Sequence, residues 1–292
     1  MSVSENFSTF CSNLRMSSDT VSKIQQRYQK ITKRINLDYW GNQSETAHSL
    51  YVGSYGRGTE IWTSDIDVIV QLPYEVYTRF NAYSSNGQSA FLQEVKGVLQ
   101  KTYSTSYIKG DGQVIGINFQ DGINFEIVPA FINIHNSYTY PDSNDGGRWK
   151  ITDPRKEIDA INERNYGSNK NLKRLCRMVR AWKEKCNVPI SGILIDTLAY
   201  KFIENWTYKD KSYLYYDFMS RDFFYYLKNI DISKSYWLAP GSNRFVYKSG
   251  SFQSKATIAY NNALEAISYE DNNKFYSARY KWREIYGAKF PE

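Results

Sequence analysis

The chain has 292 residues and a mass of 34.1 kDa, with 41% hydrophobic and 23% charged residues and a formal net charge of +7. This length is enough for one large or two modest domains, and the composition is ordinary for a soluble globular protein. No apolar stretch approaches the ~20 residues that span a bilayer, and no leader pattern opens the chain, so we expect a cytoplasmic protein. The positive charge fits a partner rich in phosphate, without choosing between nucleotide and nucleic acid.

The cysteines and histidines give no metal or disulfide framework. Cys11, Cys176 and Cys186 are odd in number, and no pair has metal-ligand spacing. His48 and His135 are far apart in the sequence, so we expect no histidine-based zinc site. Nothing in this pattern requires an oxidising compartment.

Taken in chain order, residues 1–37 carry apolar side chains at helical spacing, which predicts an N-terminal helix with Ser17 among its candidate caps. A short strand over residues 49–52 ends in Gly53. The turn Gly53-Ser54-Tyr55-Gly56 offers exposed backbone N–H groups and a hydroxyl, and such concavities hold phosphate. Alone, this pattern is more often a common surface loop.

Two carboxylates one residue apart, Asp65 and Asp67, open an apolar run that predicts a strand over residues 65–72. Alternation places them side by side, with Ile66, Val68 and Val70 facing a core. Adjacent like charges raise each other's pKa and are best tolerated with cations between them. Hard oxygen ligands at this spacing suit Mg²⁺. Together with the preceding turn, they favour a site for nucleotide phosphate and metal.

The following segments are expected to cover and extend this strand. Residues 74–83 are expected to be irregular, and residues 89–103 form an amphipathic helix. A hairpin pairs residues 114–119 with 123–128 through the Asp121-Gly122 turn, and Pro129 is expected to end it. Glu126 shares one face of the second strand with Asn124 and Val128.

The second half of the chain is predicted to be helical. After a loop over residues 135–147, helices are expected at residues 171–186, 193–206, 212–230 and, as two helices, 252–286. Ser191 is a good N-cap for the second of these. Lys173, Arg177, Arg180 and Lys183 make the first of them basic, and the simplest interpretation of such charges is a solvated face.

The Gly53-Ser54 turn, the spacer and Asp65-Ile66-Asp67 on a strand resemble the signature of the polymerase-beta-like nucleotidyltransferases. This version is most similar to the bacterial CD-NTases, relatives of cyclic GMP–AMP synthase and oligoadenylate synthetase. The family has a third carboxylate two residues before a Val-Pro pair. Glu126 stands at that position, where the family often has Asp.

The resemblance implies roles for these residues. Asp65, Asp67 and Glu126 would bind two Mg²⁺ ions, or Mn²⁺ in their place, and Gly53 and Ser54 would hold the donor's phosphates. The matching family helix carries a cation that reaches the donor's phosphates; Arg180 falls at that position, and Lys183 lies one turn on. Ser191 matches a family serine. The Ser and base-stacking Tyr that often follow it are Gly192 and Ile193 here, which leaves the base-stacking residue unassigned.

The implied fold is α+β: a nucleotidyltransferase core with a mixed sheet and an N-terminal spine helix over residues 1–154, packed on a helical lobe over residues 155–292. The implied activity is the joining of nucleoside triphosphates (ATP, GTP or pyrimidine NTPs) into a cyclic di- or trinucleotide second messenger for antiphage (CBASS) signalling. Accessory proteins are further implied partners. The resemblance implies no membrane partner. Nucleic acid is not a required partner, and its binding is left open.

Several alternatives stay open at this point. A different acceptor would make the chain a linear oligonucleotide synthase or an enzyme that adds nucleotides to RNA ends. A catalytically silent fold that senses nucleic acid belongs to another class, although the intact carboxylate set argues against it. A nucleotidyltransferase of the toxin–antitoxin kind would modify a protein or transfer RNA. The residues leave open the bases joined, the linkage, the ring size, the activator and the oligomeric state.

Overall fold

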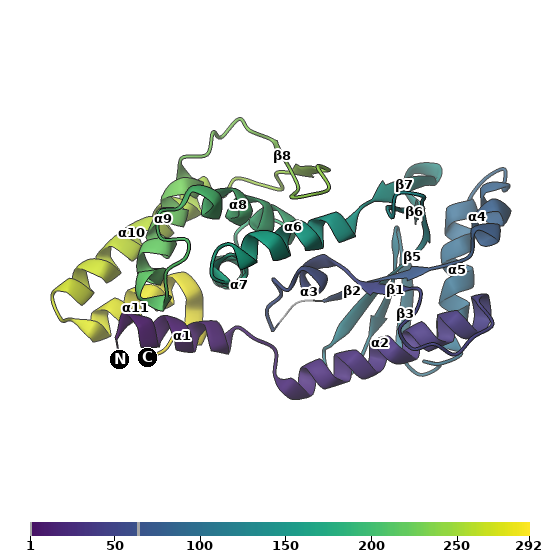
Figure 1. Cartoon of the computed structure of the whole chain (residues 1–292), viewed down its shortest axis with the longest axis horizontal. Helices are drawn as coiled ribbons and strands as arrows, with labels where there is room; N and C mark the ends of the chain where they lie inside the picture. Colours follow the sequence, from purple (N-terminus) through teal and green to yellow (C-terminus); the bar gives the residue numbers. More distant parts are fainter. Residues whose placement is uncertain (1, 63–64) are drawn as a thin grey trace. The chain divides into compact units, whose positions relative to one another are not determined.

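The computed structural model describes residues 2–62 and 65–292, which belong to two compact units (Figure 1). The first, here called the sheet unit, comprises Met16–Arg57 and Thr63–Ile158. The second, the helical unit, comprises Met1–Arg15, Gly58–Trp62 and Asp159–Glu292. Compared with the expected division at residues 154 and 155, the helical unit also takes in the first helix and a short segment that directly follows the Gly53-Ser54 turn.

Within the described residues, seven strands of the sheet unit form one mixed sheet, and the expected α+β class is confirmed. Strands β2 and β5 run parallel, and the other paired strands run antiparallel. The order is β1-β2-β5-β4-β3, and β6 extends the sheet from the second half of β5 and pairs with β7. The strands are β1 Ser49–Tyr51, β2 Ile66–Gln71, β3 Tyr107–Asp111, β4 Val114–Asn118, β5 Asn124–Ile132, β6 Tyr138–Asp142 and β7 Arg148–Thr152.

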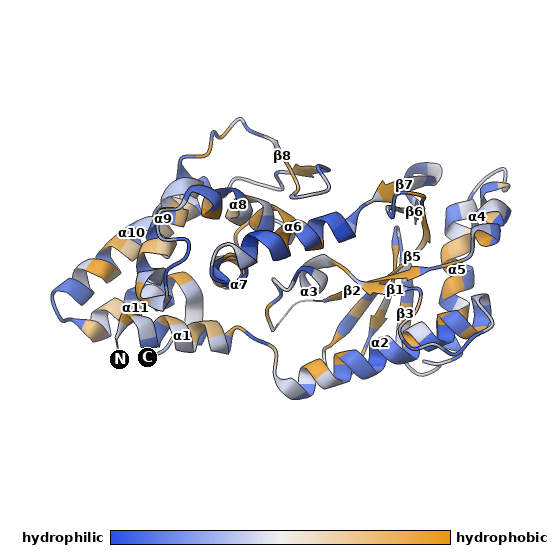
Figure 2. Cartoon of the chain, in the orientation of Figure 1, coloured by the Kyte–Doolittle hydropathy of each residue, from blue (hydrophilic) through white to orange (hydrophobic). Residues whose placement is uncertain are grey.

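One face of the sheet is a hydrophobic core. On β2 the side chains of Ile66, Val68 and Val70 are fully buried, and on β5 those of Phe125 and Ile127 are too. They pack with apolar side chains of three helices, α2 (Ser18–Tyr39), α4 (Tyr74–Asn81) and α5 (Gly87–Gln100). Figure 2 shows β2 as a hydrophobic strand. Burial of such side chains is worth roughly 1.5–3 kcal/mol each. The alternate residues of β2 and β5 therefore face the opposite side, where Asp67 and Glu126 lie. Ile69 and Ala130 of the same two strands belong to a second, small apolar cluster.

The helical segment expected over residues 1–37 consists of two helices, and the candidate cap Ser17 begins the second of them. Helix α1 spans Val3–Asn13, and α2 begins at Ser18. Ser17 is the N-cap of α2, and its hydroxyl accepts a hydrogen bond from the Thr20 N–H at 3.1 Å. Because a cap residue has extended backbone, it starts a new helix and cannot lie inside a continuous one.

Within residues 74–83, Tyr74–Asn81 form helix α4, so the expectation of irregular structure is wrong for these eight residues. Helix α4 is stabilised by aromatic packing: Tyr77 contacts Phe131 and Phe80 contacts Phe91, with ring centroids 5.4 and 5.3 Å apart. These contacts join residues far apart in the sequence, so local periodicity could not indicate them.

Pro129 does not end its strand, which continues to Ile132. The Ala130 carbonyl accepts a hydrogen bond from the N–H of Leu72, the residue that follows β2, so the backbone groups of Ala130 face β2. Because these groups alternate along a strand, those of Pro129 face the opposite edge of β5. Pairing with β4 stops at Ile127, and no ladder hydrogen bond is lost there.

The expected loop over residues 135–147 contains strand β6. Tyr138 is buried in it, and Asp142 forms ion pairs with Arg148 and Lys150 at 3.3 and 2.8 Å. Pairing with β7 therefore fixes a segment whose composition is typical of loops.

The helical unit packs around one large core that contains Phe7, Trp182 and Trp282. Helix α7 is confirmed with the expected bounds, and Ser191 caps α8 as expected, accepting from the Leu194 N–H at 3.3 Å. No helix among the described residues has the length and apolar character needed to cross a membrane. The remaining elements are α3 Gly53–Arg57, η1 Asn144–Gly146, α6 Pro154–Tyr166, α7 Asn171–Cys186, α8 Gly192–Asn205, η2 Tyr213–Tyr215, α9 Tyr216–Lys228, β8 Tyr236–Leu238, β9 Phe245–Tyr247, α10 Gln253–Asp271, α11 Phe275–Tyr286 and η3 Gly287–Lys289.

Candidate active site

The centre of the site is a pair of carboxyl groups on neighbouring strands. Asp67 of β2 and Glu126 of β5 are direct partners in the parallel register. Both project from the face opposite the core, and their carboxyl groups lie within hydrogen-bonding range of each other. The alternation of apolar and polar residues on both strands produces this arrangement.

Asp65 lies on the same side but is turned toward a different partner. It is exposed, and its Oδ1 accepts a hydrogen bond from the Asn124 side-chain amide at 3.3 Å. Asn124 precedes Glu126 by two residues, just as Asp65 precedes Asp67. The structure thus brings Asp67 and Glu126 together and places Asp65 beside them with its carboxylate held by an amide.

The pair has unusual electrostatics. Burial, the negative charge of Glu126 and the hydrogen bond between the two groups raise the pKa of Asp67 to about 7. The positive charge of Arg57 opposes this shift. Arg57 is itself buried and forms an ion pair with Glu157 at 3.3 Å. A carboxyl group that retains its proton near neutral pH is one whose charged form lacks a compensating cation.

Gly53 allows the close approach of the turn to the carboxylate. The Val52 N–H donates to the Asp67 carbonyl at 2.9 Å, which places the turn directly against β2. Gly53 has a φ of +58°, and a Cβ there would lie 1.7 Å from the Asp67 Oδ2 atom. Glycine is therefore required both for its backbone conformation and for space. Ser54 follows as the second residue of α3.

A divalent cation fits the chemistry of this donor set. Across residues 2–62 and 65–292, no group of three His, Cys, Asp or Glu side chains is arranged to hold a metal ion. Asp65 is turned to Asn124. Two adjacent carboxylates with mutual repulsion nevertheless form a favourable environment for Mg²⁺, which takes one or two carboxylates along with water and substrate oxygens. Asp67 and Glu126 are the residues that would hold it, with the exposed Asp65 as a further oxygen ligand.

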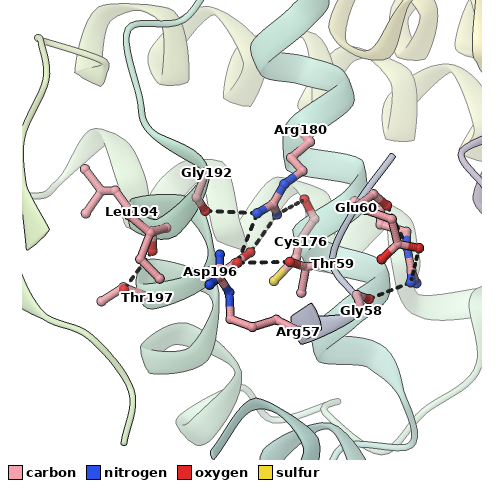
Figure 3. Close-up of polar contacts among 12 residues, drawn as sticks. Arg57, Gly58, Thr59, Glu60, Cys176, Arg180, Gly192, Leu194, Asp196 and Thr197 are labelled. Carbon is pink, nitrogen blue, oxygen red and sulfur yellow. Dashed lines mark hydrogen bonds and ion pairs between the residues drawn. The ribbon is translucent and has the colours of Figure 1, made fainter. Parts of the chain in front are cut away.

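Arg180 of the helical unit is committed to an internal ion pair. It is buried, and its guanidinium donates to both oxygens of Asp196 at 2.6 and 3.0 Å and to the Gly192 carbonyl at 3.1 Å (Figure 3). Asp196 also accepts a hydrogen bond from Thr59 at 2.9 Å. The predicted contact of Arg180 with a nucleotide phosphate stays a prediction.

Arg177 is the second buried cation of α7, so this helix does not present an entirely solvated basic face. Its Nε donates to the Glu60 carbonyl at 3.0 Å, and its Nη2 donates to the Gly58 carbonyl at 2.5 Å and to the Glu60 carboxylate at 3.3 Å. Arg177 and Asp196 thus fix the segment Gly58–Trp62 within the helical unit. That segment leads along the chain from the Gly53-Ser54 turn to Asp65.

The other two predicted phosphate contacts also lie in the helical unit. Lys183 is partly exposed on α7, and no hydrogen bond or ion pair of its ammonium occurs among the described residues. Ser191 uses its hydroxyl as the N-cap of α8. Their contact with nucleotide stays a prediction.

Sequence reasoning did not single out Asn124, Arg177 or Asp196 for the site. Asn124 had a signal in the sequence, because it lies two residues before Glu126 and therefore shares its face of the strand. Asp196 had no local indication, because its partners Arg180 and Thr59 are distant in the chain.

Comparison with known proteins supports the predicted resemblance. Residues 1–165 match the model of a family described as "Second Messenger Oligonucleotide or Dinucleotide Synthetase domain". A probable cyclic nucleotide synthase of Bacillus cereus (strain VD146) is 31% identical over an alignment of 177 residues that covers 57% of this chain. The aligned part spans about half, 51%, of that relative's length.

Solved structures share the fold across nearly the whole chain. The structure of CdnC from E. coli MS115-1 in complex with HORMA-deltaN has a TM-score of 0.72 and 14% identity, covering 99% of this chain and 98% of that one. The structure of the same E. coli protein with ATP has a TM-score of 0.67 and 17% identity, covering 99% of both chains. At these identities the likeness establishes the fold alone.

Proposed function

Because the chain belongs to the family of second messenger oligonucleotide or dinucleotide synthetase domains, we propose that it joins nucleoside triphosphates into a cyclic di- or trinucleotide. The observation that supports this most strongly is the pairing of Asp67 with Glu126 on adjacent parallel strands, against the turn at Gly53. Nucleotidyltransferases need acidic ligands for divalent cations next to a phosphate-holding turn, and these residues supply both.

In the proposed reaction, a ribose hydroxyl attacks the α-phosphorus of a triphosphate. A new phosphodiester P–O bond forms, the bond between the α-phosphorus and the bridging oxygen breaks, pyrophosphate leaves, and the hydroxyl proton passes to solvent. The Ser54 hydroxyl and the backbone at Gly53 would hold the β- and γ-phosphates. Asp67, Glu126 and Asp65 would hold the cations. When bound, these ions neutralise phosphate charge and lower the pKa of the attacking hydroxyl.

The chain's own residues mainly supply position and charge. Ion binding would replace the proton that Asp67 retains and remove its repulsion with Glu126. The exposed Asp65 would exchange its hydrogen bond with Asn124 for an ion contact by side-chain rotation. Such transfer depends on alignment and charge stabilisation, without a covalent intermediate on the protein.

The biological setting is a further part of the proposal. A structure of the E. coli relative contains ATP, and another contains a HORMA protein. By analogy we propose ATP or another NTP as substrate here and an antiphage signalling role with an accessory protein.

Product identification tests this proposal. The chain is incubated with all four NTPs and Mg²⁺, with and without RNA, and products are analysed by mass spectrometry before and after phosphatase treatment. A phosphatase-resistant species with the mass of a cyclic di- or trinucleotide is expected, independent of RNA, and the Asp67→Asn variant should yield none. A phosphatase-sensitive linear product, or labelling only of added RNA, would contradict cyclisation and favour the alternative acceptors.

A further inference from the structure

A basic cavity lies in the helical unit, and its lining contains none of the three carboxylates of the candidate active site. Its volume is about 260 Å³. At ~30 Å³ for each liquid water, this is the space of on the order of eight waters, enough for a phosphoryl group with part of its hydration. It is lined by Ser8, Cys11, Ser12, Arg15, Arg174, Arg177 and Tyr213.

The three arginines keep unused hydrogen-bond donors. Arg174 donates through Nη1 to Asn169, Asn171 and Tyr216, and among the described residues its Nε and Nη2 make no hydrogen bond. Arg177 uses Nε and Nη2 for the segment Gly58–Trp62 but leaves Nη1 without a partner in the part of the chain that the structure describes. The guanidinium of the exposed Arg15 has no hydrogen-bonded or ionic partner within residues 2–62 and 65–292. A guanidinium carries five N–H donors, so each residue can still bind an anion.

The positive charge of this cavity is only partly compensated. The carboxylate of Glu60 pairs with Arg177 at 3.3 Å, while Arg15 and Arg174 form no ion pair among the described residues. Burial lowers the pKa of Arg177, and the charge of Arg15 lowers it further. Burial and the charges of Arg177 and Arg15 also lower the pKa of the neighbouring Lys173. Like charges are therefore held close together, and a bound anion would relieve their repulsion.

We propose that this cavity is a binding site for a phosphoryl dianion, either inorganic phosphate or the terminal phosphate of a free nucleotide. Guanidinium forks match phosphate oxygens, and the hydroxyls of Ser8 and Ser12 lie in the same lining. The ring of Tyr213, with its centroid 4.7 Å from the Arg174 guanidinium carbon, helps to orient that fork. A small cavity with converging donors fits one phosphoryl group better than the extended backbone of a nucleic acid, which requires a continuous basic surface.

Anion binding in this cavity would also affect the segment Gly58–Trp62, because Arg177 contacts both. Arg177 holds the Gly58 carbonyl and the Glu60 side chain with donors that the proposed anion does not need. An anion bound through Nη1 would therefore leave these contacts intact and would relieve the repulsion between Arg177 and Arg15. Amide hydrogen exchange in this segment is expected to slow when phosphate is added.

The test is a phosphate titration of the full chain in EDTA, followed by calorimetry and by thermal unfolding. Wild type is expected to show saturable binding and a rise in melting temperature, and Arg15→Gln to weaken the affinity by about tenfold or more. Because Arg15 is exposed and unpaired among the described residues, this variant should fold normally. Arg79→Gln, which removes a half-exposed arginine of the sheet unit, is the matched control and should bind as wild type does.

Further measurements distinguish the two sources of the phosphoryl group, free phosphate and nucleotide, and give the results that would overturn the proposal. Binding of ATP that is tighter than that of phosphate, and unaffected by Asp67→Asn, would identify the nucleotide as the natural source; equal binding would identify free phosphate. The proposal is overturned if no saturable phosphate binding occurs, if Arg15→Gln and Arg79→Gln weaken it equally, or if Asp67→Asn abolishes it. Binding of a short DNA duplex without binding of phosphate would overturn it as well.

Discussion

The close approach of Gly53 to Asp67 gives a quantitative prediction with an internal control. A Cβ at Gly53 would lie 1.7 Å from Oδ2 and 2.8 Å from Cβ of Asp67, so rotation of the carboxylate alone cannot make room. Gly41 has a similar positive φ, +64° against +58°, but nothing lies within 4 Å of a Cβ there. Substituting each by alanine therefore separates backbone strain from steric displacement of the carboxylate.

The expected magnitudes follow from these two contributions. Left-handed backbone costs roughly 1–2 kcal/mol for a residue with a Cβ, and this cost applies to both variants. Overpacking adds about 1–3 kcal/mol, and only Gly53→Ala has this term. We expect Gly41→Ala to lose about 1–2 kcal/mol of unfolding free energy and Gly53→Ala roughly 2–5 kcal/mol.

Activity should separate the two variants even more clearly. Displacing Asp67 by about an ångström is expected to lower nucleotide incorporation on the order of 100-fold, while Gly41→Ala should retain wild-type turnover. Urea denaturation gives the stabilities, and incorporation of labelled triphosphate gives the activities. If Gly53→Ala were no less stable than Gly41→Ala and equally active, the turn would not lie against Asp67 as described.

Three further predictions concern the buried charges. Burial and then the charge of Glu126 raise the pKa of Asp67. Glu126→Gln removes that charge, so in EDTA at pH 8 the free energy of unfolding should rise by about 1–3 kcal/mol. An unchanged or lower value from urea denaturation would contradict the repulsion. In the metal-free wild type, the folded pKa of Asp67, about 7, lies above the ordinary value of 3.8, so the folded state binds more protons between these pH values. The stability that this group contributes should therefore be present below about pH 4 and be lost as the pH rises to 7. Mg²⁺ should weaken this dependence of the unfolding free energy on pH. A stability that increases with pH over this range would refute the prediction. Asp196→Asn leaves Arg180 buried without its anion and should cost roughly 3–5 kcal/mol, whereas Glu204→Gln, at an exposed ion pair, should cost at most about 1 kcal/mol; equal losses in denaturation curves would refute the difference.

Sequence patterns were sufficient for the elements that local chemistry determines. The alternation around Asp67 and Glu126 predicted which side chains share a face, because a strand has a period of two. The apolar stripe of α7 predicted its bounds, and the hydroxyl of Ser191 predicted the start of α8. In each case the signal lies within a few residues of the feature that it predicts.

The remainder depends on contacts between distant residues. Helix α4 is stabilised by rings from other elements, and β6 by pairing with β7. Arg180 and Asp196 form an ion pair that the sequence did not predict, because the packing of α7 against α8 brings the two charges together. The turn of Asp65 toward Asn124 also follows from strand pairing, which side-chain type alone does not specify.

The central claim is that Asp67 and Glu126, on neighbouring parallel strands, together support nucleotidyl transfer. Its most direct test is the incorporation of α-labelled triphosphate with Mg²⁺ by Asp67→Asn and Glu126→Gln, each first shown by circular dichroism and urea denaturation to be folded. Both variants are expected to have no incorporation above background. Wild-type turnover in either folded variant would contradict the claim.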